Sequence, residues 1–192
     1  MYQLNKPFVL WLTGLPCSGK STLAKAIEEE LSIDTDFPVK VLDGDEFRSQ
    51  FSKELGFSIE DRHTNNLRIA KKAIETANTG KVVVVAVVSA YRKTREKIKE
   101  LFEGLIEVHV KCPVETCEAR DIKGMYKKAR EGKMKNFTGV NDPYEEPLDP
   151  EIEVNTGENG IGGCSAIIIQ GLVKLEYISI TNSGATGDKL KA

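Results

Sequence analysis

Short apolar segments alternate with amphipathic ones along most of the chain, and this pattern predicts strands that alternate with helices. Phe8–Leu12, Val39–Leu42 and Leu105–Val110 have the length and composition of strands. Val82–Val88 is apolar throughout, which is typical of a strand buried on both faces of a parallel sheet. Glu151–Val154 predicts a short edge strand. We therefore predict a doubly wound α/β fold: a mostly parallel five-stranded sheet, flanked by helices, that binds ligands at the carboxyl ends of its strands.

The amphipathic segments between the strands predict the helices. Ser58 is a suitable N-cap for the longest one, about Glu60–Asn78, because its hydroxyl can accept a hydrogen bond from a first-turn N–H group. Residues 1–7 predict a polar lead-in, residues 1–180 one domain and residues 181–192 a flexible tail. The other predicted helices are Ser21–Leu31, one beginning near Glu46, Thr94–Phe102, and Pro113–Glu131 with a break near Gly124. Ile167–Ile178 is interpreted as a helix, with a strand as the alternative.

The loop after the first predicted strand carries the clearest chemical signal. Its sequence matches the phosphate-binding pattern G-x-x-x-x-G-K-[ST] and lies between a strand and a helix. Glycines let successive N–H groups turn toward an anion, and the helix N-terminus adds positive potential. We expect Lys20 to contact the β- and γ-phosphates and the Ser21 hydroxyl to ligate Mg²⁺. A chance glycine-rich turn is the alternative, but the context favours a nucleoside triphosphate site formed by Gly14, Leu15, Pro16, Cys17, Ser18, Gly19, Lys20, Ser21 and Thr22.

Two acidic residues follow the second predicted strand. Asp43 and Asp45 are two positions apart, so both side chains can face one cleft. One can accept the proton of an attacking hydroxyl while the other helps Ser21 to hold Mg²⁺. We assign Asp45 as the base, because Arg48 stands one helical turn further on and can keep it ionised. A turn whose aspartates only cap the next helix is the alternative.

The segment Arg120–Lys135 contains seven basic residues against Asp121 and Glu131. A basic segment of this kind can close as a lid over a triphosphate and exclude water from the transfer. A solvent-exposed basic helix is the alternative interpretation.

Composition narrows the classes of partner. The 192 residues include 27 basic and 29 acidic ones, a net charge of −2, which gives no reason to expect nucleic acid or a membrane surface as a partner. The longest apolar run, Val82–Val88, is too short to span a bilayer. The four cysteines lack the spacing of a metal site and are interpreted as reduced thiols in the cytoplasm.

Several separated stretches together resemble the adenylylsulfate kinase (APS kinase) family, from about Phe8 to Thr156. In order along the chain, they are the phosphate loop, Leu42–Arg48, Leu55–Ser58, Asp61-Arg62, Arg120–Arg130, Phe137–Val140, Asp142–Glu145 and Pro150–Ile152.

The resemblance implies that the enzyme uses ATP and Mg²⁺ to phosphorylate the 3′-hydroxyl of adenosine 5′-phosphosulfate. It also implies a cytoplasmic homodimer that receives this substrate from an ATP sulfurylase. It implies that Asp45, Lys20 and Ser89 act in catalysis and that Phe57 and Phe137 hold the substrate adenine between aromatic faces. We expect Ser89 to hydrogen-bond the substrate rather than to carry phosphate, since phosphoryl transfer needs mainly positioning and charge. The implied substrate contacts are Asp43, Gly44, Asp45, Arg48, Phe57, Arg62, Asn65, Ser89, Lys123, Phe137 and Thr138.

Some positions depart from the family pattern. Ala90 replaces a proline, which removes a fixed backbone angle after Ser89, and Asn66 and Leu67 replace an aliphatic residue and an arginine.

Two rival functions remain. One is a kinase of the same fold for another small metabolite or nucleotide, and the other is a nucleotide-sensing domain without turnover, against which the intact Lys20 and Asp45 argue.

Overall fold

A computed structural model describes residues 1–33 and 37–181 and places a parallel sheet at the centre of the molecule. In spatial order, its strands are β3 (Val39–Asp43), β4 (Val82–Ala86), β2 (Val9–Thr13), β5 (Leu105–Lys111) and β6 (Ile152–Asn155). All four neighbouring pairs are parallel. The predicted five-stranded α/β fold, including its edge strand, is confirmed.

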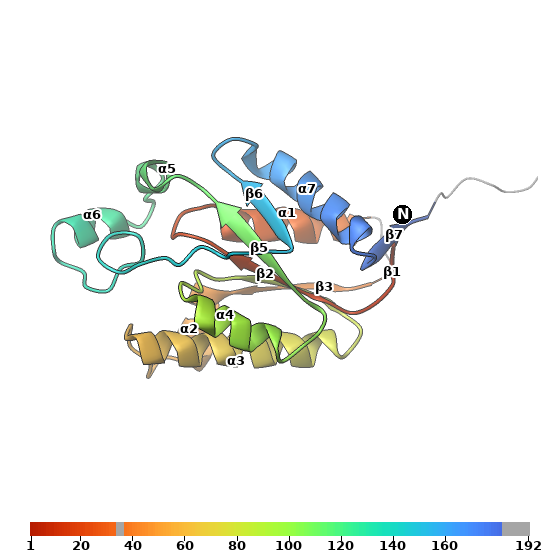
Figure 1. The fold of residues 1–192 in the computed structure, drawn as a ribbon, viewed down its shortest axis with the longest axis horizontal. Helices are drawn as coiled ribbons and strands as arrows, with labels where there is room; N and C mark the ends of the chain where they lie inside the picture. Colours follow the sequence, from red (N-terminus) through yellow and green to blue (C-terminus); the bar gives the residue numbers. More distant parts are fainter. Residues whose placement is uncertain (34–36, 182–192) are drawn as a thin grey trace, which may run out of the picture.

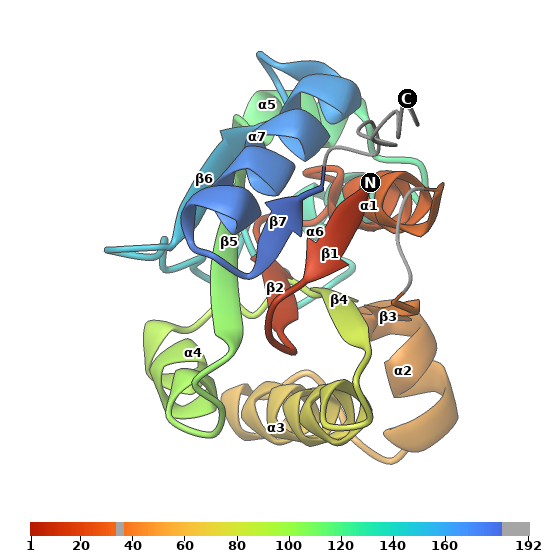
Figure 2. The ribbon, with the colours of Figure 1, turned by 90° about the vertical axis from the view of Figure 1, so that its right-hand side faces the viewer.

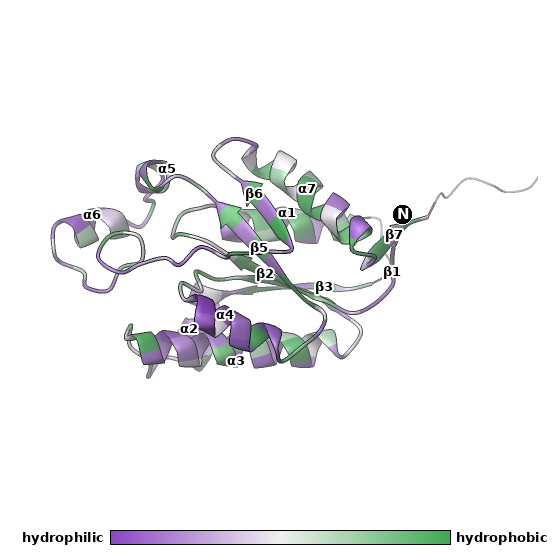
Figure 3. Ribbon diagram, viewed as in Figure 1, coloured by the Kyte–Doolittle hydropathy of each residue, from purple (hydrophilic) through white to green (hydrophobic). Residues whose placement is uncertain are grey.

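Helices cover both faces of this sheet (Figure 1). Helices α1 (Lys20–Ile33) and α7 (Gly160–Lys174) lie on one face, and α2 (Gly44–Phe51), α3 (Ile59–Ala77) and α4 (Arg92–Lys99) lie on the other. Successive strand residues point to opposite faces, so Leu10 joins the core beneath α1 and α7, whereas Trp11 joins the core above α3. Hydrophobic residues accordingly dominate the central strands, while α4 is largely hydrophilic (Figure 3).

The ends of the longest helix agree with the prediction. The Ser58 hydroxyl accepts a hydrogen bond of 3.1 Å from the N–H of Asp61 and caps α3. The predicted break in Pro113–Glu131 is also present, because the segment forms two short helices, α5 (Val114–Ala119) and α6 (Met125–Arg130), with Gly124 at a φ of 63° between them. These helices extend beyond the carboxyl ends of the strands (Figure 1).

Two expectations near the chain ends are wrong. The predicted polar lead-in contains a strand, β1 (Tyr2–Leu4), which pairs antiparallel with β7 (Ile178–Ile180), as Figure 2 shows. The predicted helix Ile167–Ile178 instead begins at Gly160 and ends at Lys174. Its glycines permit close packing, since a side chain at Gly171 would collide with Ile152 of β6. Residues 182–192 of the predicted tail lie outside the described residues.

No helix in the described ranges is long and apolar enough to cross a membrane.

Candidate active site

The loop between β2 and α1 has the shape that a phosphate cradle requires. Gly19 has a φ of 95° and Cys17 a φ of 61°, so two of its residues adopt the left-handed region. A side chain at Gly14 would collide with the carbonyl of Val110. The Tyr126 hydroxyl donates a hydrogen bond of 3.0 Å to the carbonyl of Pro16 and ties α6 to the loop. The loop is therefore held from the β5 side and from the α6 side.

Lys20 begins α1 and turns its ammonium group back into the loop. Its Nζ donates to the carbonyls of Gly14 at 2.9 Å and Leu15 at 2.6 Å. Burial lowers the pKa of Lys20 to about 8, and nearby negative groups, including Asp43 and Asp45, partly oppose this shift. A buried ammonium that gains a phosphate partner recovers the electrostatic stabilisation that it lost with its water.

Ser21 and Asp43 meet at the adjoining edge of the site. The Ser21 hydroxyl donates a hydrogen bond of 2.5 Å to Asp43 Oδ2. The other carboxylate oxygen, Oδ1, accepts from the N–H groups of Asp45 at 2.9 Å and Glu46 at 3.4 Å and caps α2. The sequence left open whether Asp43 caps α2 or lies beside the loop. In the structure it does both, with a different carboxylate oxygen for each contact.

A hydroxyl and a carboxylate side by side are suitable donors for Mg²⁺, which binds oxygen and keeps several of its waters. Within residues 1–33 and 37–181, no three His, Cys, Asp or Glu side chains gather into a metal site. An all-protein cage is therefore not built here, but Mg²⁺ held together with substrate phosphates does not require one.

Asp45 lies in the first turn of α2, where Lys123 Nζ donates a hydrogen bond of 2.7 Å to its Oδ2. This contact raises the pKa of Lys123. The charge of Arg48 acts on Asp45 as well, since burial lowers the pKa of Arg48 while Asp45 raises it, but the Arg48 guanidinium donates its hydrogen bonds to the carbonyls of Leu55 and Gly56 and lies 4.8 Å from the ring centre of Phe57. Lys123, rather than Arg48, is the direct cationic partner of Asp45.

Arg62 joins the two segments that contain the predicted aromatic contacts. It donates to the Phe57 carbonyl at 3.1 Å, to Thr138 Oγ1 at 2.5 Å and to the carbonyl of Asn136. Asp142 forms an ion pair with the same guanidinium at 3.2 Å. The segment after α6 is thereby fixed against α3.

The two predicted aromatic contacts have different surroundings. Phe57 is 60% exposed under the guanidinium of Arg48, whereas Phe137 is 8% exposed and packs edge-on against Tyr126 at 4.9 Å. The exposed face of Phe57 is available to a ligand. An adenine held between Phe57 and Phe137 stays a prediction.

Two buried polar atoms of the predicted site have no hydrogen-bond partner among the described residues: Ser89 Oγ and Asn65 Oδ1. Both residues are almost fully buried, at 2% and 4% exposure. Unsatisfied buried polar atoms are rare and costly in folded proteins. These two atoms lie after β4 and on the Arg62 face of α3, and their contact with a substrate stays a prediction.

The basic segment is only partly directed at the site. Arg130 pairs with Glu118 at 2.5 Å and Lys133 with Glu131 at 2.6 Å, so two of its cations have local partners. Closure of this segment as a lid stays a prediction.

The sequence did not single out the contact between Arg120 and Thr156 behind the loop. Arg120 donates to the Thr156 carbonyl at 3.1 Å, and the Thr156 hydroxyl donates to the carbonyl of Ser18 at 2.7 Å. Only the position of Thr156 could have pointed to this contact, because the residue follows the carboxyl end of the edge strand β6.

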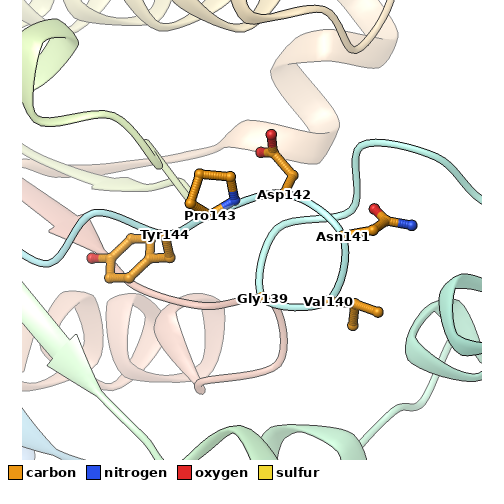
Figure 4. Close-up of a pocket in the computed structure, with 6 residues that line it drawn as sticks. All are labelled: Gly139, Val140, Asn141, Asp142, Pro143 and Tyr144. Atoms are coloured by element: carbon orange, nitrogen blue, oxygen red, sulfur yellow. The ribbon is translucent and has the colours of Figure 1, made fainter.

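An open pocket of about 380 Å³ is lined by residues 139–144 (Figure 4). Its wall contains Asp142, which accepts hydrogen bonds from Arg62 and from the hydroxyl of Tyr91. Tyr144, also in the wall, lies with its hydroxyl 3.0 Å from Thr13 Oγ1. The pocket therefore borders the predicted acceptor side through Asp142 and the loop side through Tyr144.

Comparison with known proteins agrees with this geometry. The profile of the adenylylsulphate kinase family matches residues 6–155. The chain belongs to this family. An adenylyl-sulfate kinase from Thermodesulfovibrio yellowstonii is 46% identical over 167 residues, which cover 85% of this chain and 83% of that protein.

Solved structures of kinases resemble this chain as well. The APS kinase CysC of Mycobacterium tuberculosis, determined with AMPPNP and APS, superposes with a TM-score of 0.83 at 33% identity and covers 88% of this chain and 98% of its own. A gluconokinase from Sinorhizobium meliloti superposes with a TM-score of 0.56 at 18% identity over 88% of this chain and 93% of its own. The second likeness concerns the fold alone.

Proposed function

We propose that this kinase transfers the γ-phosphate of ATP to the 3′-hydroxyl of adenosine 5′-phosphosulfate, which yields 3′-phosphoadenosine 5′-phosphosulfate and ADP. The observation that carries the proposal is the family match, which spans both the phosphate loop and the acceptor-side residues Arg62 and Lys123. Two buried atoms on the acceptor side, in Ser89 and Asn65, have no partner within the described part of the chain and support a polar second substrate.

The phosphates of ATP occupy the loop, where backbone N–H groups and Lys20 balance their charge. Asp45 accepts the proton of the acceptor hydroxyl, and exchange of its exposed contact with Lys123 frees the carboxylate for this step. Lys123 and Arg62 supply the positive charge for the anionic groups of adenylylsulfate. Ser89 and Asn65 donate to and accept from the acceptor nucleoside and satisfy their buried atoms.

Ser21 and Asp43 hold Mg²⁺ through the hydroxyl and carboxylate oxygens that meet at 2.5 Å. When bound, Mg²⁺ neutralises charge on the phosphate oxygens.

The proposal extends to the setting of the reaction. The enzyme acts in the cytoplasm as a homodimer and receives adenylylsulfate from an ATP sulfurylase. Free cysteines in the described part of the chain and the absence there of a helix that could cross a membrane are compatible with this setting.

One assay tests the reaction. ATP and Mg²⁺ are supplied with adenylylsulfate or, in parallel, with AMP, and ADP release is followed together with the nucleotide products. We expect turnover with adenylylsulfate and little with AMP, because AMP lacks the sulfate that the cationic acceptor side recognises. Comparable rates with the two acceptors would contradict the proposal, and ATP binding without turnover on either would favour a nucleotide sensor.

A further inference from the structure

Arg95 of α4 is buried at 3% exposure, although its guanidinium always carries a charge. All three of its nitrogens donate hydrogen bonds of 2.6 Å: Nε to Glu107 Oε1, Nη1 to the Ser89 carbonyl and Nη2 to the Glu145 carbonyl. One side chain thereby joins β5, the turn after β4 and the segment that contains the pocket of Figure 4.

The Ser89 contact holds a strained residue. Ser89 has a φ of 45°, in the left-handed region that residues with a Cβ atom rarely adopt. Such conformations persist only where the surroundings impose them, and they gather at functional sites. Here the constraint acts on the Ser89 carbonyl, which accepts from Arg95 Nη1 at 2.6 Å, while the Thr13 hydroxyl donates to the neighbouring carbonyl of Val88 at 2.7 Å. The Ser89 hydroxyl is left buried and without a partner among the described residues.

The Glu145 contact connects the same guanidinium to Arg62. The N–H of Glu145 donates to the carbonyl of Ala90 at 2.9 Å, so this segment and the Ser89 turn run side by side. Three residues earlier, Asp142 accepts from Arg62 and orients it. Arg95 therefore holds the backbone of two segments of the acceptor side, one at Ser89 and the other at Glu145, three residues after the carboxylate that contacts Arg62.

Glu107 supplies the counter-charge for Arg95 from β5. It is 5% exposed and also pairs with Lys99 at 3.1 Å. Burying an ion pair costs so much desolvation that packed apolar residues serve stability equally well. By contrast, the planar guanidinium of Arg95 reaches three acceptors in fixed directions, and neither an apolar residue nor lysine can do the same.

We infer that Arg95 is a positioning residue of the acceptor site. Anchored by Glu107, it holds Ser89 in the conformation that presents its hydroxyl to the acceptor, and it couples this turn to the segment that orients Arg62. This inference rests on the proposed function, because that function assigns Ser89 and Arg62 to adenylylsulfate.

The test compares Arg95→Lys with Arg68→Lys. Lysine keeps the charge facing Glu107, but its donors lie on a single nitrogen and cannot reach the three separated acceptors that the guanidinium fork serves. Arg68 is a control for the chemical change alone, because it too bonds a carboxylate, Glu54, and a carbonyl, that of Phe51, although its side chain is 40% exposed. We expect Arg95→Lys to raise the KM for adenylylsulfate about 10-fold or more and to change the Kd of a non-hydrolysable ATP analogue less than about 2-fold. Arg68→Lys should change neither constant.

A merely structural role predicts a different result: a lower thermal midpoint and kcat in Arg95→Lys with an unchanged KM for adenylylsulfate. Should Arg95→Lys fail to fold, Glu107→Gln loosens the same anchor and should raise this KM in the same direction. An unchanged KM in that variant would overturn the inference.

A crystal structure of Arg95→Lys separates this inference from the proposed function. We expect Ser89 to relax to a negative φ. If the wild type turns over adenylylsulfate but Arg95→Lys keeps both its KM and the left-handed Ser89, the positioning role is wrong and the function stands.

If the wild type does not turn over adenylylsulfate, the proposed function fails. The conformation of Ser89 in Arg95→Lys still decides the role of Arg95: a relaxed Ser89 supports the positioning role, and a left-handed Ser89 overturns it.

Discussion

Lys123 Nζ lies 2.7 Å from Asp45 Oδ2 and brings the connection between α5 and α6 into contact with the first turn of α2. Both side chains are largely exposed, at 69% and 80%. Exposed ion pairs are worth little in water, so the two groups can separate at small cost. Asp45 is therefore neutralised by a partner that it can exchange for a substrate, and its role as a base is open to a direct test.

Asp45→Asn is expected to lower kcat about 10²-fold or more, because an amide cannot accept the proton of the acceptor hydroxyl. Binding of a non-hydrolysable ATP analogue should change little, since we propose that the phosphates bind in the loop at the start of α1. Steady-state rates with adenylylsulfate and equilibrium binding of the analogue measure the two effects separately.

Glu46→Gln is the matched control for this variant. Glu46 is the next residue in α2 and is also exposed, so its amide removes one negative charge beside the site without touching the assigned base. We expect near-normal kcat in this control. Equal losses in both variants would mean that net charge, rather than proton transfer, is what Asp45 supplies.

Much of the fold could be predicted because its signals are local. The apolar run at Val82–Val88 becomes the buried strand β4, and Ser58 caps α3 as its sequence context predicts. Pairing of β1 with β7 joins Tyr2 to Ile180, and no local pattern identifies partners so far apart. The start of α7 was placed too late, at Ile167 instead of Gly160, because glycines have low helix propensity.

The candidate site divides in the same way. The placement of Asp43 beside the loop could be predicted, because the loop pattern and the acid at a strand end are local signals. The partner of Asp45 could not, since Lys123 is 78 positions away and only the fold brings it there. Nothing in the sequence indicated that Arg95 is buried. An arginine in a charged helix is usually exposed, and the burial of this one depends on Glu107 in another element.

Ser89→Ala is expected to keep at least about a tenth of wild-type turnover, because direct phosphoryl transfer needs no covalent intermediate on serine. The KM for adenylylsulfate should rise through loss of one hydrogen bond. No label should transfer from γ-labelled ATP to the wild-type protein in the absence of the acceptor. Loss of all turnover together with stable labelling of Ser89 would establish the covalent route instead.

The same substitution should stabilise the free protein by about 1 kcal/mol, because it removes a buried hydroxyl that has no partner among the described residues. Ser165→Ala is the contrasting control, since the buried Ser165 hydroxyl donates to Glu30 at 2.6 Å and its removal breaks a bond. Chemical denaturation of both variants without ligands should therefore give opposite signs. A destabilised Ser89→Ala would show that the hydroxyl is satisfied in the free protein.

Asp43 combines a cap with a place beside the Ser21 hydroxyl, and two substitutions separate these roles. Asp43→Asn retains a capping oxygen, so we expect nearly normal stability but a requirement for about 10-fold more Mg²⁺ at half-maximal turnover. Asp43→Ala should show the same Mg²⁺ requirement and lose about 1 kcal/mol of stability as well. Chelation of Mg²⁺ should abolish turnover in all three proteins. An unchanged Mg²⁺ dependence in Asp43→Asn would remove Asp43 from the metal site.

Lys20 should make the stability of the nucleotide-free protein depend on pH. Its folded-state pKa of about 8 lies below the ordinary value of 10.5, so the charged form is disfavoured by folding. At pH 7 both states are protonated and the folded state bears a cost of up to about 3 kcal/mol. Between pH 8 and 10.5 the folded state releases its proton while the unfolded state keeps it, and this contribution to stability rises with pH.

Lys20→Met should remove that cost. We expect the variant to be more stable than the wild type at pH 7, although it binds ATP poorly, and the difference should shrink as the pH rises from 8 toward 10.5. Urea denaturation across this range, without nucleotide, measures the difference. Lys25→Met, at an exposed lysine of the same helix, should show no such trend. A Lys20→Met protein that is less stable than the wild type at pH 7 would mean that the hydrogen bonds of the ammonium to the Gly14 and Leu15 carbonyls outweigh its burial.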